Sequence, residues 1–182
     1  EDDRALKPSN KISLNIVLKG DAKLPKYGTP HSSGFDIAAN FSDVEDYNTY
    51  AYRFNKVEFT DYMIVGRKNE SDFGVYILPG HSAPIPTGVY IELPLGFEAM
   101  IRPRSGIATK QGLRLANCEG TVDADYRGEY IVALYNDSDV PQLVMPGMKV
   151  AQVILGRVDQ ATFNVVDKLS DTVRGVGGFN ST

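Results

Sequence analysis

The density of turn residues is the feature that most constrains how this chain can fold. Seventeen glycines and ten prolines interrupt the 182 residues, and few windows between them hold an apolar repeat of 3.6 residues. Short segments in which apolar and polar residues alternate predominate instead. The residues that alternate onto one face of an expected strand are Ile12, Leu14, Ile16 and Leu18, and then Phe97, Ala99 and Ile101. Many short strands joined by turns favour an all-β sandwich or closed barrel over a parallel α/β sheet.

Two further segments predict buried strands. Residues 131–135 are apolar on both faces, which indicates a central strand, and residues 150–155 are nearly as apolar. We expect at most one short helix, near residues 106–111, and find no internal repeat.

Length, charge and cysteine content narrow the class of protein. A chain of 182 residues suits one domain, and its 42% apolar content can build a core. A net charge of −4 offers no basic surplus for a nucleic-acid backbone, so we expect no nucleic-acid partner. No apolar run approaches the length of a membrane span, no signal-peptide pattern opens the chain, and Cys118 is the single cysteine. We therefore expect a soluble, cytoplasmic protein without a membrane partner, or a nuclear or host-cytoplasmic one if the source is eukaryotic or viral. The first residue is Glu1 rather than Met, as expected if a short leader was removed or the chain was renumbered.

Two segments depart from the compact pattern. Residues 43–72 form a polar, tyrosine-rich insertion whose alternation changes phase, which predicts a hairpin arm with a bulge. Residues 167–182 are rich in glycine and predict a flexible C-terminal lid arm after a β domain that spans residues 1–166.

Signatures of familiar catalytic sites are mostly absent, and four clusters of polar residues remain. Residues 103–106 lie at a strand-to-helix junction, where backbone N–H groups and an arginine suit a phosphate, although a plain helix N-cap explains them better when they are taken alone. Residues 117–128 read as a β-hairpin with Asp123 at a strand end and Tyr126 at the turn; an ordinary acidic turn is the alternative. Gln152 is an isolated polar residue in a buried strand and needs a partner, either structural or a ligand. The glycine-rich tail resembles a backbone cradle for phosphates.

The order and spacing of these clusters resemble the homotrimeric dUTPase family (deoxyuridine triphosphate nucleotidohydrolases). Five segments match that family's motifs in order: residues 33–37, 103–108, 120–128, 147–152 and 174–182. The third reads Gly-Thr-Val-Asp-Ala-Asp-Tyr-Arg-Gly and ends at Gly128. Departures from the family pattern are Ala116 before Asn117, the pair Cys118 and Glu119, Asn180 in the tail, and the insertion.

The resemblance implies a fold and a reaction. The fold would be a jelly-roll-like distorted β-barrel that assembles into a homotrimer, with each active site shared between chains. The reaction would be magnesium-assisted hydrolysis of dUTP to dUMP and pyrophosphate by attack of water on the α-phosphorus. By the same resemblance, its product would supply thymidylate synthesis, and its consumption of dUTP would keep uracil out of DNA.

The resemblance also implies roles for individual residues. Asp123 would activate the water as a general base, and Tyr126 would lie under the deoxyribose and exclude a 2′-hydroxyl. Groups around the third motif would read the uracil edge, namely Asn117, Gly120, Thr121, Val122 and Ile131. Positions that hold the phosphates would be Arg104, Ser105, Gly106 and Gln152. The tail would close over the ligand through Arg174, Gly178, Phe179, Ser181 and Thr182. The phosphates would carry most of the Mg²⁺ coordination, with Asp36 making a water-mediated contact at most.

Two rival readings stay open at this level. dCTP deaminases share the fold, but they need a glutamate in the strand after the hairpin, and residues 131–136 contain no acidic side chain. A binding or regulatory module would use the insertion to engage a protein partner, whereas the simpler alternative is that the insertion packs on its own subunit or a neighbour.

Overall fold

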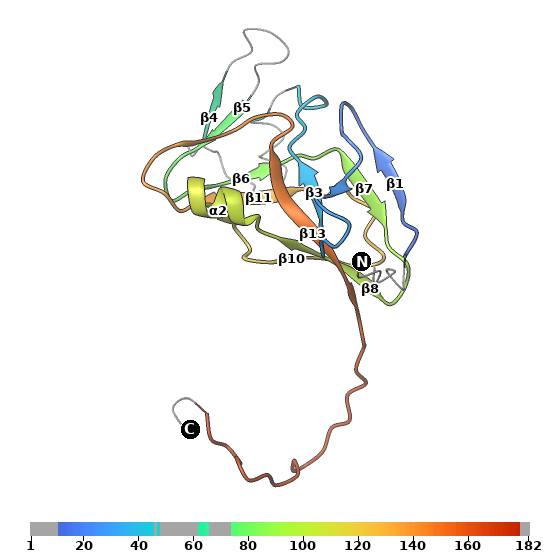
Figure 1. The fold of residues 1–182 in the computed structure, drawn as a ribbon. Coiled ribbons are helices and arrows are strands. Elements are labelled where there is room, and N and C mark those ends of the chain that lie inside the picture. Colours follow the sequence, from blue (N-terminus) through green and yellow to red (C-terminus); the bar gives the residue numbers. More distant parts are fainter. Residues whose placement is uncertain (1–10, 46, 48–61, 66–73, 179–182) are drawn as a thin grey trace, which may run out of the picture.

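The computed structural model describes residues 11–45, 47, 62–65 and 74–178, the range 62–65 through its backbone. Within these residues the chain forms four antiparallel sheets that wrap around one core (Figure 1). In the described part of the chain, α2 (Ser105–Gln111) is the one helix that is described from its first residue to its last. No described helix is long and apolar enough to cross a membrane.

The largest sheet has five strands in the order β10-β8-β13-β3-β2. Its strands are β10 (Gly120–Val122), β8 (Phe97–Arg102), β13 (Lys149–Arg157), β3 (Phe35–Ala38) and β2 (Lys26–Tyr27). β13 lies centrally and pairs with β3 and β8, with Gln152 opposite both Asp36 and Arg102. The first, third and fourth sequence motifs therefore meet in one sheet, and the second follows directly after β8.

Three smaller sheets complete the barrel. One has the order β6-β11-β9, with strands β6 (Ser82–Ile85), β11 (Val132–Asn136) and β9 (Leu113–Leu115). Another has the order β12-β5-β4, with strands β12 (Gln142–Val144), β5 (Gly74–Ile77) and β4 (Tyr62–Val65). The last pairs β1 (Asn15–Leu18) with β7 (Val89–Glu92).

The five-stranded sheet and both three-stranded sheets contribute side chains to the core. Residues with almost no exposed surface include Ile37, Ile77, Ile85, Leu113 and Leu134. Burial of each such side chain favours folding by about 1.5–3 kcal/mol, and together they fix how the sheets face one another. The all-β, jelly-roll-like architecture expected from the turn pattern and the family resemblance is thus confirmed.

The first strand is shorter than its alternation predicts. Ile12, Leu14 and Ile16 are half-buried as expected, but pairing begins only at Asn15, opposite Glu92. Pro94 follows two residues after Glu92, and because proline has no backbone N–H, the ladder ends there.

The strand within residues 131–135 is central, as predicted, but it is buried on one face only. Val132 and Leu134 are buried, whereas Ala133 and Tyr135 are half-exposed within one chain. Asn136 is also buried, and its side-chain amide donates to the carbonyl oxygens of Ile77 and Val140.

The hairpin predicted across residues 117–128 is wrong. β10 pairs with β8, whereas β11 pairs with β6 and β9, so the two segments belong to different sheets. The core requires this separation, because Gly120 packs against Ile101 while Leu134 pairs with Leu115. Residues 123–131 are therefore an open loop that joins two sheets.

The insertion is described in part. Val44 and Tyr47 are buried, and β4 pairs with β5. The bulged arm predicted around Tyr50, Tyr52, Phe54, Val57 and Phe59 lies outside the described residues. After β13 ends at Arg157, residues 158–178 leave the body as an extended arm without helix or strand (Figure 1).

Candidate active site

A cavity opens where the two sheets diverge after β10. Its volume is about 440 Å³, and it lies between β8 and β10 on one side and β6 and β11 on the other. The lining residues are Ser82, Ala83, Pro84, Ile101, Ala116, Thr121, Val122, Asp123, Tyr126, Glu129, Tyr130, Ile131 and Ala133. Most of this lining is apolar, and it includes no lysine or arginine. Such a cavity suits an uncharged, flat ligand group better than a phosphate.

Asp123 lies at the edge of this cavity, directly after the last residue of β10. Its side chain is exposed, and no hydrogen bond or ion pair to its carboxylate is present among the described residues. Its backbone carbonyl accepts the N–H of Tyr126 at 3.2 Å, which closes the turn that begins the loop. The strand end fixes the backbone of Asp123 and leaves its carboxylate open to water or a ligand.

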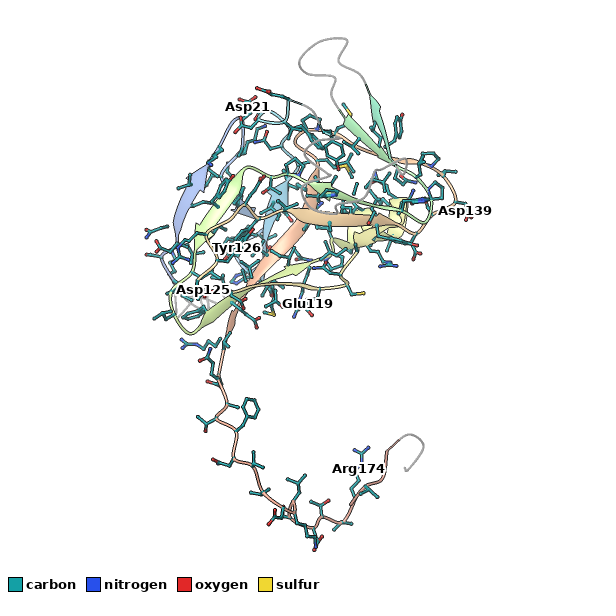
Figure 2. The ribbon with its side chains drawn as sticks, turned by 180° about the vertical axis from the view of Figure 1, so that it is seen from behind. Asp21, Glu119, Asp125, Tyr126, Asp139 and Arg174 are labelled. Atoms are coloured by element: carbon teal, nitrogen blue, oxygen red, sulfur yellow. The ribbon has the colours of Figure 1, made fainter. Side chains whose placement is uncertain are left out.

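Tyr126 lies over the backbone of the same loop (Figure 2). Its hydroxyl donates to the carbonyl oxygen of Glu129 at 3.0 Å. A side chain at Gly128 would collide with the Tyr126 ring, so the glycine is needed for this close approach. Burial raises the pKa of Tyr126 above its ordinary value, and the neighbouring Glu129 and Tyr90 add to this effect. An ordinary tyrosine is already protonated at neutral pH, so this shift only extends to higher pH the range in which the Tyr126 hydroxyl can donate.

Arg127 anchors the loop from outside the cavity. Its guanidinium donates to the carbonyl oxygens of Ala124 at 2.7 Å and Tyr126 at 3.0 Å, and also to Glu92 at 3.1 Å. The hydrogen bond from Asn15, followed by the charge of Arg127, lowers the pKa of the Glu92 carboxyl. Glu92 therefore remains ionised and paired with Arg127 across the neutral range.

A separate cluster of charges lies where β3, β8 and β13 meet. The two carboxylate oxygens of Asp36 accept from Arg104 Nε and Lys149 Nζ, each at 2.8 Å. Gln152 Nε2 donates to the carbonyl oxygen of Pro103 at 2.9 Å, which gives this polar residue a structural partner. Two cations around one carboxylate leave an excess of positive charge beside the start of α2.

The start of α2 does not form a side-chain N-cap. Arg104 occupies the N-cap position with extended backbone angles and makes no capping hydrogen bond. Ser105 and Gly106 are exposed, and a Cβ at Gly106 would meet no atom within 4 Å. Packing inside one chain therefore does not require glycine at this position.

The register keeps Asp123 and Arg104 apart within one chain. Val122 pairs with Ala99, so Asp123 lies level with Glu98, whereas Arg104 follows the opposite end of β8. The four residue steps from 98 to 102 alone span roughly 13 Å. The base-sized cavity and the charged cluster are thus two separate half-sites on the same chain.

The tail is remote from both half-sites in the single chain. Arg174 lies on the extended arm, away from the body that carries Tyr126 (Figure 2). Its guanidinium donates to the carbonyl oxygen of Gly177 at 2.8 Å, and Gly178 is exposed. Phe179, Ser181 and Thr182 lie outside the described residues.

The site residues expected from the sequence thus lie in three places of the single chain, namely the cavity, the charged cluster and the C-terminal tail. The cavity gathers Thr121, Val122, Asp123, Tyr126 and Ile131, with Asn117 and Gly120 on the adjoining exposed turn and strand β10. The charged cluster gathers Asp36 and Arg104, with Gln152 opposite Asp36 in the register.

Several residues of the cavity and of the charged cluster were not predicted from the sequence. Lys149 belongs to the fourth motif, and its charge between apolar neighbours was a usable signal. Glu129 and Tyr130 directly follow the third motif, but nothing in their spacing separates them from ordinary loop residues. Ser82, Ala83 and Pro84 reach the cavity only because β6 pairs with β11, which no local pattern reveals.

The described residues contain no group of three or more His, Cys, Asp or Glu side chains that could hold a metal ion. Asp36 has both carboxylate oxygens engaged by cations. A divalent ion at these half-sites would need most of its oxygen ligands from a bound phosphate chain and water.

Comparison with known proteins points to one family. A family profile described as dUTPase matches residues 70–182. The chain is 38% identical over 172 residues to a deoxyuridine 5'-triphosphate nucleotidohydrolase of Chlamydia pneumoniae, covering 94% of this chain and 98% of the relative. It is 40% identical over 159 residues to the protein of that name from Maricaulis maris, covering 87% of this chain and 86% of the relative.

Solved structures agree at the level of the fold. A mutant dUTPase of Staphylococcus bacteriophage 80alpha with dUpNHpp has a TM-score of 0.65 at 18% identity, covering 94% of this chain and 98% of that one. A dUTPase from Streptococcus mutans has a TM-score of 0.58 at 20% identity, covering 81% of this chain and 98% of that one. On the family profile and the relatives that match almost its whole length, this chain belongs to the dUTPase family.

Proposed function

We propose that this protein hydrolyses dUTP to dUMP and pyrophosphate. The observation that carries the proposal is the exposed, unpaired carboxylate of Asp123 at the edge of an uncharged cavity large enough for a nucleoside. A carboxylate held by a strand end can accept a proton from one water molecule and direct that water at the α-phosphorus. Pyrophosphate then leaves from the opposite side of the phosphorus atom.

The nucleoside half of the substrate occupies the cavity. Backbone groups at Thr121, Val122 and Ile131, together with the Asn117 side chain, read the edge of the uracil ring. A cytosine presents a donor where uracil presents an acceptor, so buried groups would be left unpaired, which discriminates by ~10⁴ or more. Tyr126 lies against the deoxyribose and leaves no room for a 2′-hydroxyl.

The triphosphate lies against the charged cluster. Arg104, with Ser105 and Gly106 beside it, and Gln152 hold its oxygen atoms, and Lys149 adds a positive charge. Magnesium fits there as an ion carried by the phosphates, with Asp36 in contact through water at most; when bound, it neutralises phosphate charge. The C-terminal residues Arg174, Gly178, Phe179, Ser181 and Thr182 close over the substrate and exclude water.

These half-sites act together in a homotrimer. Their separation along β8 supports a site in which the cavity of one chain faces the charged cluster of another. The arm supports the same assembly, because Phe163, Val165 and Leu169 are exposed there and have no core to pack on within their own chain. Light scattering should report a molar mass of three times 20.0 kDa, the mass of one chain. A monomer that is fully active would contradict a site shared between chains.

The proposed role is removal of dUTP before DNA synthesis and supply of dUMP for thymidylate synthesis, in the cytoplasm. The protein partner of insertion 43–72 stays a prediction. Among the insertion's tyrosines, Tyr47 is buried and donates to the carbonyl oxygen of Pro84 at 2.7 Å, which supports packing on its own subunit there.

One assay separates the proposed activity from its rivals. Pure protein is incubated with Mg²⁺ and dUTP, dCTP or dTTP, and pyrophosphate and ammonia are measured. We expect pyrophosphate from dUTP alone and ammonia from none. Ammonia from dCTP would indicate a deaminase, although Glu129, the acidic residue nearest β11 in the cavity, already holds two backbone N–H groups. Absence of any turnover would favour a binding module.

A further inference from the structure

Glu129 connects the loop at the cavity to a turn from a distant part of the chain. Its carboxylate oxygen Oε1 accepts the backbone N–H of Thr87 at 2.8 Å and that of Gly88 at 2.7 Å. These two residues lie in the connection between β6 and β7, which comprises residues 86–88. Two consecutive N–H groups directed at one anionic oxygen are a strong local binding arrangement.

The turn that receives Glu129 has a fixed conformation. Gly88 has a φ of +66°, and a side chain there would collide with the carbonyl oxygen of Lys19 and with Asn40. Thr87 is buried, and its hydroxyl donates to the carbonyl oxygen of Tyr130 at 2.6 Å. The backbone N–H of Tyr130 in turn donates to the carbonyl oxygen of Val89 at 2.8 Å. The turn is therefore a rigid support on which the end of the loop is mounted.

Glu129 also contacts the ring that faces the sugar in the proposed function. Its backbone carbonyl accepts the hydroxyl of Tyr126 at 3.0 Å, and both residues line the cavity. The same residue thus attaches its side chain to the rigid turn and its main chain to Tyr126. Any displacement of Glu129 moves the acceptor that orients the Tyr126 ring.

We propose that Glu129 is a positioning residue for nucleoside selectivity, which holds the 126–131 loop on the β6–β7 turn so that Tyr126 excludes ribonucleotides. The inference rests on the proposed function, since it assigns a role within that site. Glu129 does not touch the reacting phosphate, so its loss should weaken recognition of the sugar and leave the chemical step nearly unchanged.

Three substitutions at this position separate geometry from charge. Glu129→Ala removes the acceptor, and Glu129→Asp keeps the charge but is one methylene too short to reach the turn. Glu129→Gln keeps the length and one acceptor oxygen. Asp137→Ala is the control, because Asp137 is an exposed carboxylate paired with Arg114 outside the cavity.

The measurement is kcat and KM for dUTP and for UTP with each variant, together with the melting temperature. For Glu129→Ala and Glu129→Asp we expect the dUTP-over-UTP ratio of kcat/KM to fall by about 10-fold, which corresponds to one or two lost hydrogen bonds. We expect kcat for dUTP to stay within about 3-fold of the wild type, so that the change in the kcat/KM ratio comes from the KM values. Glu129→Gln and Asp137→Ala should keep most of the wild-type selectivity.

Two results overturn the inference. One is an unchanged dUTP-over-UTP ratio in both Glu129→Ala and Glu129→Asp, even if the melting temperature falls, since Glu129 would then serve stability alone. The other is a wild-type ratio in Glu129→Asp with a lost ratio in Glu129→Gln, since charge rather than reach would then matter. If Glu129→Ala does not fold, Glu129→Asp carries the test. Failure of the wild type to hydrolyse dUTP would instead refute the proposed function.

Discussion

Removing a single hydroxyl from each of two buried tyrosines should change stability in opposite directions. Tyr130 is 2% exposed, and its hydroxyl has no hydrogen-bond partner within the described chain. Tyr47 is 1% exposed, and its hydroxyl donates to the carbonyl oxygen of Pro84 at 2.7 Å. Tyr130→Phe and Tyr47→Phe delete the same atom from two rings with almost no exposed surface, although Tyr130 also lines the cavity. The two variants therefore isolate the effect of the missing partner.

The magnitudes follow from these two environments. A buried polar group without a partner costs about 1–3 kcal/mol, so Tyr130→Phe should raise the free energy of unfolding by about 1 kcal/mol. Tyr47→Phe loses a buried hydrogen bond and should lower it by about 1 kcal/mol. For a chain of this size, the two melting temperatures should then differ by about 4–8 °C. Burial raises the pKa of Tyr130 to about 12, so its hydroxyl does not titrate in the assay range.

Differential scanning calorimetry and urea unfolding at one fixed protein concentration are the appropriate assays, because association makes the melting temperature depend on concentration. The wild type and both variants should be compared in the absence of nucleotide. A Tyr130→Phe variant that melts below the wild type, as Tyr47→Phe should, would refute the reasoning. It would mean that the Tyr130 hydroxyl has a partner in solution, such as an ordered water.

Three further outcomes are expected. Asp123→Asn should lower turnover by ~10²-fold or more with dUTP affinity largely kept, because the amide cannot take the proton; near-normal turnover would exclude Asp123 as the base. Deleting residues 174–182 should strongly reduce turnover and leave the melting temperature within about 2 °C, since residues 174–178 pack on no core; an unchanged rate would exclude the lid. Asp36→Asn should lower the free energy of unfolding by about 1–2 kcal/mol in urea, because Arg104 and Lys149 lose a charged partner; no change would mean that water replaces the carboxylate at no cost.

The described part of the insertion contributes to the core but not to the cavity. Replacing residues 43–72 by a short turn should leave uracil specificity unchanged, since none of the described residues in that range lines the cavity. The replacement should also reduce stability, because Val44 and Tyr47 belong to the core. Sequence alone could not reveal this, because a tyrosine beside polar residues reads the same whether its ring is buried or exposed.

Local chemistry in the sequence determined much of this protein. Alternation and turn residues predicted an all-β fold, and glycine and proline set the strand limits, because backbone conformation at these residues is a local property. The placement of Asp123 at a strand end and of α2 after residue 104 also followed from neighbouring residues.

Tertiary structure decided which strands pair and therefore what the site contains. The hairpin expected across residues 117–128 did not form, because burial of Leu134 against Leu115 and of Gly120 against Ile101 draws β11 and β10 into different sheets. That divergence creates the cavity and brings Ser82, Pro84 and Glu129 to it from segments that share no motif. Lys149 joins Asp36 and Arg104 only through the pairing of β13 with β3. Such contacts depend on burial between residues far apart in the sequence. The packing of the whole core determines which strands pair, and no short segment of the sequence contains that information.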